Sequence, residues 1–165
     1  MLIRRLVTDD LEAVLALNGD NVPAVSAVDA PELARLVDLT SISLVAEVDD
    51  AFAGFCMVMP PGVDYASLNY GWFGAHAAEL GYDDFAYLDR IVVDAGVRGK
   101  GIGAELYEAV EDSIAGTPWL LCEVNLRPRN DGSLRFHQRL GFVEVGQQET
   151  PYDVLVSMLA KDVRR

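Results

Sequence analysis

A glycine-rich stretch at residues 98–104, with the sequence RGKGIGA, has the composition of an anion-binding loop. An apolar, β-branched run precedes it and a helical pattern follows it, so we expect a strand, this loop and then a helix. The first turn of a helix leaves backbone N–H groups without intrahelical partners, and these attract anions together with the helix dipole. Glycines let a bulky anion approach the backbone. The stretch therefore predicts a phosphate or pyrophosphate site, and the alternative is a tight turn without a ligand.

The spacing within this stretch narrows the choice of ligand. Neither the G-x-G-x-x-G fingerprint of dinucleotide-binding folds nor the G-x-x-x-x-G-K-[ST] string of P-loops is present. The order Arg98-x-x-Gly101-x-Gly103 resembles the acetyl-CoA signature of the GNAT superfamily of N-acetyltransferases, [QR]-x-x-G-x-[GA]. A second stretch, residues 130–142, resembles the family pattern N-x-x-[AS]-x-x-x-[YH]-x-x-x-G-F, and one predicted strand separates the two motifs.

The resemblance implies a fold and a reaction. The implied fold is α/β (α+β), with a mixed, mostly antiparallel sheet of six to seven strands, about four flanking helices and two splayed central strands. The implied reaction moves an acetyl group from acetyl-CoA to a primary amine of a small molecule or peptide, by direct attack in a ternary complex. The alternative is a catalytically silent CoA-binding module of the same fold that acts as a regulator.

The resemblance also implies which residues bind acetyl-CoA. The strand before the loop would offer backbone groups to the pantetheine arm, the loop would bind the pyrophosphate, and Asn130 would hydrogen-bond the arm. The expected contacts are Ile91, Val92, Val93, Arg98, Gly99, Lys100, Gly101, Ile102, Gly103, Ala104, Asn130, Ser133 and His137. No cluster of cysteines or histidines has metal-ligand spacing, so we expect no metal.

His137 departs from the commonest family pattern, in which a tyrosine acts as acid toward the leaving thiolate. A neutral imidazole can donate a proton from one nitrogen, and its ordinary pKa lies close to working pH. Leu134 and Leu140 share a helix face with His137, so a packing role is the alternative. The sequence leaves the catalytic and the packing interpretation open.

Two acidic residues in predicted central strands, Asp89 and Glu123, are candidates for the base that deprotonates the amine. An ammonium group has an ordinary pKa near ~10.4 and must lose a proton before it attacks the thioester. Acidic groups are rarely buried without a task or a partner. The alternatives are an ion pair with Arg90 or Arg127, exposure at a strand end, and a water chain without a single base.

An aromatic-rich segment, residues 62–84, is predicted to be irregular. Long loops in compact domains are usually functional or disordered, and aromatic residues argue against disorder. We therefore expect a wall or lid on the acceptor side of the site. A short helix near residues 75–80 is an alternative that is compatible with this role. The expected acceptor contacts are Tyr70, Trp72, Phe73 and Tyr87.

The length, net charge and hydropathy of the chain predict its domain number, its partners and its location. A chain of 165 residues is predicted to form a single domain over residues 1–165. The net charge of −13 opposes nucleic-acid binding and suits a cationic small molecule or a basic protein segment. The alternative is that the acidic surface only keeps the protein in solution. No apolar run has the length of a membrane span, and the N-terminus does not read as a signal peptide, so we expect a cytoplasmic protein. A homodimer is one option for its assembly.

The predicted elements follow the order strand, helix, helix, strand, strand before the two motifs. Strands are expected at residues 1–7, 42–48, 51–59, 85–93, 119–125, 142–148 and 154–160. Helices are expected after a capping Thr8, near residues 31–37, from residue 102 to about 115, and at residues 133–140.

Overall fold

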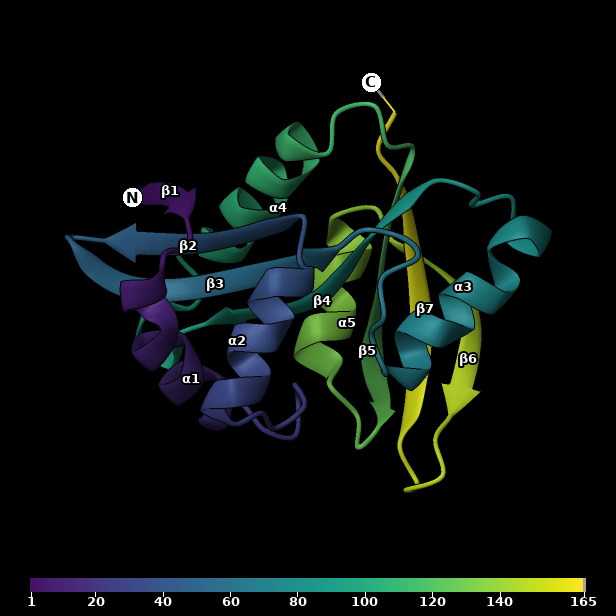
Figure 1. Cartoon of the computed structure of the whole chain (residues 1–165), viewed down its shortest axis with the longest axis horizontal. Coiled ribbons are helices and arrows are strands. Elements are labelled where there is room, and N and C mark those ends of the chain that lie inside the picture. The colour runs from purple at the N-terminus through teal and green to yellow at the C-terminus, as the bar shows by residue number, and fades with distance from the viewer. Residues whose placement is uncertain (165) are drawn as a thin grey trace. The chain divides into compact units, whose positions relative to one another are not determined.

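A computed structural model of the chain describes residues 1–164 as a seven-stranded sheet flanked by five α-helices (Figure 1). The strand order is β1-β2-β3-β4-β5-β7-β6. The strands are β1 (Leu2–Arg5), β2 (Ile42–Val48), β3 (Ala51–Met59), β4 (Phe85–Val93), β5 (Trp119–Arg127), β6 (Val143–Glu149) and β7 (Leu155–Asp162). The helices are α1 (Leu11–Gly19), α2 (Ala30–Leu39), α3 (Leu68–Leu80), α4 (Ile102–Ser113) and α5 (Asp131–Arg139), with 3-10 turns η1 (Thr8–Asp10) and η2 (Ala95–Val97).

The pairing of the strands confirms the predicted fold class. β4 runs parallel to β5, whereas β1 with β2, β2 with β3, β5 with β7 and β6 with β7 are antiparallel. The sheet is therefore mixed and mostly antiparallel, and it is flanked by five helices rather than about four. No helix among residues 1–164 is long and apolar enough to cross a membrane.

The described residues form two compact units. The first contains Met1–Met59 and Arg90–Ile114, and the second contains Pro60–Asp89 and the residues from 115 onward. β4 contributes its last residues to the first unit and its first residues to the second.

The core of the first unit is built on β2 and β3, which are buried over most of their length. Because successive strand residues point to opposite faces, such continuous burial requires cover on both faces. α1 contacts β3 and has α2 beside it, while α4 contacts β1, β2 and β3 (Figure 1). Gly54 of β3 is closely packed, because a Cβ there would lie 2.6 Å from the Val92 carbonyl oxygen.

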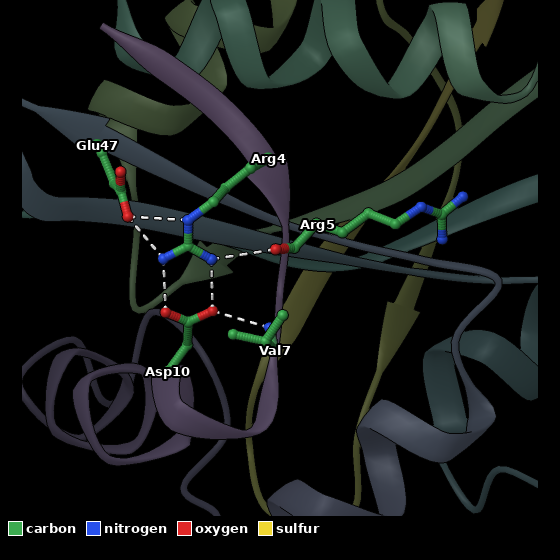
Figure 2. A network of polar contacts seen from close by, with 5 residues as sticks. All are labelled: Arg4, Arg5, Val7, Asp10 and Glu47. Atoms are coloured by element: carbon green, nitrogen blue, oxygen red, sulfur yellow. Dashed lines mark hydrogen bonds and ion pairs between the residues drawn. The ribbon is translucent and has the colours of Figure 1, made fainter.

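Arg4 of β1 joins three segments of the first unit (Figure 2). Its Nε and Nη2 donate to Oε1 of Glu47 at 2.8 and 2.6 Å. Its Nη1 and Nη2 also donate to the two carboxylate oxygens of Asp10, at 2.7 and 2.8 Å. The backbone N–H of Val7 donates to the same carboxylate at 2.8 Å. The hydrogen bonds from Arg4 hold the pKa of Asp10 below its ordinary value. The helix predicted after a capping Thr8 begins instead with the turn η1, whose N-cap is Val7.

Replacing Asp10 by asparagine should lower the free energy of unfolding by about 2 kcal/mol, because hydrogen bonds to charged groups are lost. Since the pKa of Asp10 is lower in the folded than in the unfolded chain, its contribution is present above the unfolded pKa of about 3.9. That contribution disappears as pH falls through the folded pKa. Urea titrations of the wild type and Asp10→Asn should therefore differ at neutral pH and converge in acid. The exposed neighbour gives the control, Asp9→Asn, which should change little at either pH. A difference that persists in acid would contradict this account.

In the second unit, α3 corrects the prediction of an irregular segment at residues 62–84. The Ser67 hydroxyl accepts from the Tyr70 N–H at 3.2 Å and caps the helix, and Gly81 ends it in the left-handed conformation with φ 76°. Gly71 and Gly74 lie inside the helix and weaken its intrinsic helix propensity, so the sequence pattern of this segment predicts irregular structure. Burial of Tyr70 and its neighbour Phe73 stabilises the helix instead.

The register of β4 on β5 runs from Phe85 opposite Trp119 to Tyr87 opposite Leu121. Both strands continue past this register, to Val93 and Arg127 respectively. Asp89 and Glu123 therefore lie in the continuing parts of the two strands, beyond the paired positions.

Candidate functional site

The glycine-rich loop of the first unit has the backbone that its sequence predicts for an anion site. Gly99 and Gly101 both have left-handed backbones, with φ 80° and 86°, which side-chain-bearing residues rarely adopt. Gly101 is the N-cap of α4 and no side chain caps this helix. A Cβ at Gly99 or Gly101 would meet no described atom within 4 Å, so the space beside the loop is open. The N-terminal N–H groups of α4 thus begin at an exposed loop, where no side chain caps the helix.

The remaining predicted cofactor contacts of this unit surround the loop. Arg98 donates from Nε to the Val93 carbonyl at 3.0 Å and from Nη2 to Oδ1 of Asn21 at 2.6 Å. Val92 is buried, whereas Ile91 and Val93 are partly exposed. Lys100 and Ala104 are exposed, Gly103 is partly exposed and Ile102 is buried in the core. The structure therefore gives the guanidinium of Arg98 partners within the chain and leaves Lys100 on the surface.

In the second unit, α5 carries the predicted contacts of the second motif. Asn130 caps the helix, because its Oδ1 accepts from the Ser133 N–H at 3.1 Å. His137 lies one turn after Ser133 and is buried, and its ring makes edge contacts with the rings of Phe136 and Phe142, each at a centroid distance of 5.3 Å. Its Nδ1 is 2.7 Å from the Ser133 carbonyl oxygen, which can only accept, so Nδ1 carries the proton. Burial lowers the pKa of His137 and keeps the imidazole neutral, while the bond to Ser133 acts in the opposite direction.

The two candidate bases are surrounded by hydroxyl and amide donors. Oε1 of Glu123 accepts from Nδ2 of Asn69 at 2.9 Å, and Oε2 accepts from the Tyr87 hydroxyl at 2.7 Å. Oδ1 of Asp89 accepts from the Tyr65 hydroxyl at 2.6 Å. Burial, followed by the charges of Glu123 and Asp89, holds the pKa of Tyr87 well above its ordinary value. Tyr87 is therefore a neutral hydroxyl that donates to Glu123.

Two arginines, Arg90 and Arg127, are the alternative partners of these acids in the sequence analysis. Arg127 forms ion pairs with Glu149 at 2.5 Å and with Asp153 at 2.7 Å. Arg90 is buried in the first unit, where it donates to Asn18 at 2.9 Å and to Ser26 at 3.2 Å.

The aromatic residues predicted as acceptor contacts form one packed cluster. The ring of Tyr87 lies 5.3 Å from that of Tyr70 and 5.9 Å from that of Phe73, and all three residues are buried. Trp72 stacks on His76 at 4.2 Å and lies against Gly146 of β6, where a Cβ would come within 2.6 Å of the indole. These contacts give Trp72 a packing role between α3 and β6.

Sequence reasoning missed two polar residues of this site, Asn69 and Gln148. Nε2 of Gln148 donates to Oδ1 of Asn69 at 2.7 Å, and Asn69 in turn donates to Glu123. They lie on α3 and β6, so nothing in the spacing of the chain places them beside β5. Ser67 is the sequence feature that could have helped, because a serine at this position can cap a helix and so predicts that Asn69 is helical.

Comparison with models of protein families identifies one family. The acetyltransferase (GNAT) family matches residues 14–142 of the chain. No curated protein sequence matches it.

Solved structures of similar fold include N-acetyltransferases with different acceptors. The ribosomal-protein-S18-alanine N-acetyltransferase from Escherichia coli has a TM-score of 0.74 and 18% identity, over 99% of this chain and 94% of that one. A putative acetyltransferase from Salmonella typhimurium, solved with its cofactor acetyl-CoA, has a TM-score of 0.70 and 18% identity, over 100% and 95%. An aminoglycoside 6'-N-acetyltransferase complexed with coenzyme A has a TM-score of 0.74 and 17% identity, over 100% and 98%. At these identities the likeness shows the fold.

Proposed function

Because the chain belongs to the acetyltransferase (GNAT) family, we propose that it moves an acetyl group from acetyl-CoA to a primary amine of a small molecule or peptide. The observation that carries the proposal is the loop at residues 98–104, within the matched region. Two of its glycines have left-handed backbones, and the N-terminal N–H groups of α4 that follow have no side-chain cap. Such N–H groups can bind an anion. In this proposal the loop binds the pyrophosphate, and residues 91–93 offer backbone groups to the pantetheine arm. Asn130 adds its amide N–H groups, since its Oδ1 is used in capping α5.

We assign the base to Glu123. An acceptor ammonium must lose a proton before it attacks the thioester carbonyl, which then expels the CoA thiolate. Asn69 and Tyr87 each donate to one oxygen of the Glu123 carboxylate, and these two hydrogen bonds hold the carboxylate in a fixed orientation. Asp89, with its hydroxyl donor Tyr65, is the second candidate.

The acceptor class that suits this chain is cationic. Its net charge of −13 attracts cationic amines over a distance. The names of the solved relatives include both a ribosomal-protein and an aminoglycoside N-acetyltransferase, so amines of either kind belong in the first panel. The single domain, cytoplasmic location and homodimer remain predictions.

Acetyl-CoA should raise the melting temperature of the protein. At a concentration about 100 times Kd the stabilisation should reach about 2.7 kcal/mol, because the ligand binds only the folded chain. Differential scanning fluorimetry with acetyl-CoA, ATP and NAD at equal concentrations checks this. ATP and NAD should shift the melting temperature much less. An equal shift with ATP would point to a generic phosphate site and contradict the assignment of CoA.

His137→Phe should keep turnover within about threefold of the wild type. The imidazole is neutral, its one proton is committed to the Ser133 carbonyl, and it packs against two aromatic rings. We therefore favour its packing role over its role as the acid. Phenylalanine keeps the ring volume, so melting temperature and acetyl-CoA affinity should also hold. Steady-state rates for the wild type and the variant decide the matter. A fall of about 10²–10³ in turnover at unchanged stability would restore His137 as the acid.

A further inference from the structure

Four side chains from four different elements form a continuous hydrogen-bonded chain in the second unit. Gln148 of β6 donates to Asn69 of α3 at 2.7 Å, and Asn69 donates to Oε1 of Glu123 on β5 at 2.9 Å. Tyr87 of β4 donates to Oε2 of the same carboxylate at 2.7 Å. Both carboxylate oxygens are therefore held by donors on separate elements.

The chemistry of these groups fixes the direction of every bond. An ionised carboxylate only accepts, so Asn69 must present its NH₂ group to Glu123. Its carbonyl oxygen then faces Gln148, which presents an NH₂ group in turn. The carboxylate thus determines which end of Asn69 it receives, and the NH₂ group of Gln148 completes the pairing at the other end of Asn69.

We propose that Asn69 and Gln148 are positioning residues that orient the Glu123 carboxylate through this relay. The proposal rests on the function proposed above, in which Glu123 takes the proton of the acceptor amine. With one oxygen tied to Asn69 and the other to Tyr87, the plane of the carboxylate is set by the scaffold. A base whose orientation is fixed in this way meets the incoming proton without reorganising.

Other titratable groups lie near Glu123 and contribute to the pH dependence of kcat/KM. The charges of Glu123, Asp89 and Tyr65 all raise the pKa of the buried Tyr87 hydroxyl. On the neighbouring strand β7, the residue opposite Glu123 is Met158, which carries no charge.

The test is a pair of charge-matched variants, Gln148→Glu and Gln147→Glu. A carboxylate at position 148 cannot donate to Asn69, so Asn69 turns its NH₂ group toward it and presents its oxygen to Glu123. The protonated form of Glu123 is then favoured. Gln147→Glu adds the same charge one residue away. The native Gln147 side chain is exposed and donates to Glu144 at 3.0 Å, not to Asn69. We expect Gln148→Glu to raise the midpoint of the acid limb of the kcat/KM–pH profile by about one pH unit. At pH values below the midpoints of both the wild type and the variant, kcat/KM of the variant should be about tenfold lower. Gln147→Glu should leave that midpoint in place.

A double-mutant cycle separates the relay from a direct effect of charge. In an Asn69→Ala background, Gln148→Glu should no longer shift the midpoint, because the connecting residue has gone. The titration of the Glu123 side-chain carboxyl carbon by ¹³C NMR gives a second readout, assigned by its loss in Glu123→Gln. An undiminished shift in the Asn69→Ala background would overturn the relay, as would equal midpoints for the two glutamate variants.

The NMR titration also keeps failure of the relay distinct from failure of the proposed function. It reports the midpoint of Glu123 whether or not acetyl transfer is observed. A wild type that transfers no acetyl group overturns the function, and the Glu123 midpoints of the variants still support or overturn the relay.

Discussion

Glu123→Gln should lower turnover by about 10²–10⁴, which is the usual range for loss of a positioned base. Glutamine keeps the length and planarity of the side chain but holds almost no affinity for a proton. Its oxygen can still accept from one of the two donors, Asn69 or Tyr87, so the fold around β5 should be retained. We expect acetyl-CoA affinity to be unchanged and the melting temperature to fall by only a few degrees.

Two further variants make this result specific. Asp89→Asn tests the second candidate base, and it should cost far less than Glu123→Gln if the assignment is right. Glu108→Gln removes a carboxylate from the exposed face of α4 and should leave turnover as it is. Steady-state assays of CoA release at saturating acetyl-CoA measure the turnover of the three variants. If Asp89→Asn has the large effect and Glu123→Gln the small one, the assignments of the two acids exchange.

Gly101→Val should weaken acetyl-CoA binding by at least about 100-fold, equivalent to about 2.7 kcal/mol. Gly101 has φ 86°, so any residue with a Cβ is strained there, and a valine side chain would occupy the open space at the start of α4. Isothermal titration calorimetry measures the loss directly.

The matched control for this variant lies after the other end of α4. Gly116 has φ 105° and equally open space, so Gly116→Val carries the same kind of backbone strain outside the loop. It should lower stability to a similar degree and leave acetyl-CoA affinity intact. Unchanged affinity in Gly101→Val would mean that the loop is only a turn.

The parts of this fold that the sequence predicts are those encoded by local pattern. Continuous β-branched and apolar runs predict β2 and β3, and their hairpin through Asp49 and Asp50 follows from the break between them. The glycine-rich loop is equally local, because positive φ at Gly99 and Gly101 is a property of glycine itself.

What the sequence does not predict depends on tertiary contacts. α3 contains Gly71 and Gly74, and only the burial of its aromatic residues outweighs their poor helix propensity. The same holds for the contact of Trp72 with Gly146, which needs the glycine to admit the indole. Asn69 and Gln148 are ordinary polar residues in sequence, and only the packing of α3 with β6 brings them into line with Glu123.

The most direct test of the proposed acetyl transfer is the release of CoA thiol in the presence of acetyl-CoA and a panel of cationic amines. The panel should include peptides with a free N-terminal amine, polyamines and aminoglycosides. We predict that at least one amine accelerates thiol release well above hydrolysis, and that mass spectrometry finds one added acetyl group on that amine. Tight binding of acetyl-CoA with no amine-dependent thiol release would contradict the account and favour a silent CoA-binding module.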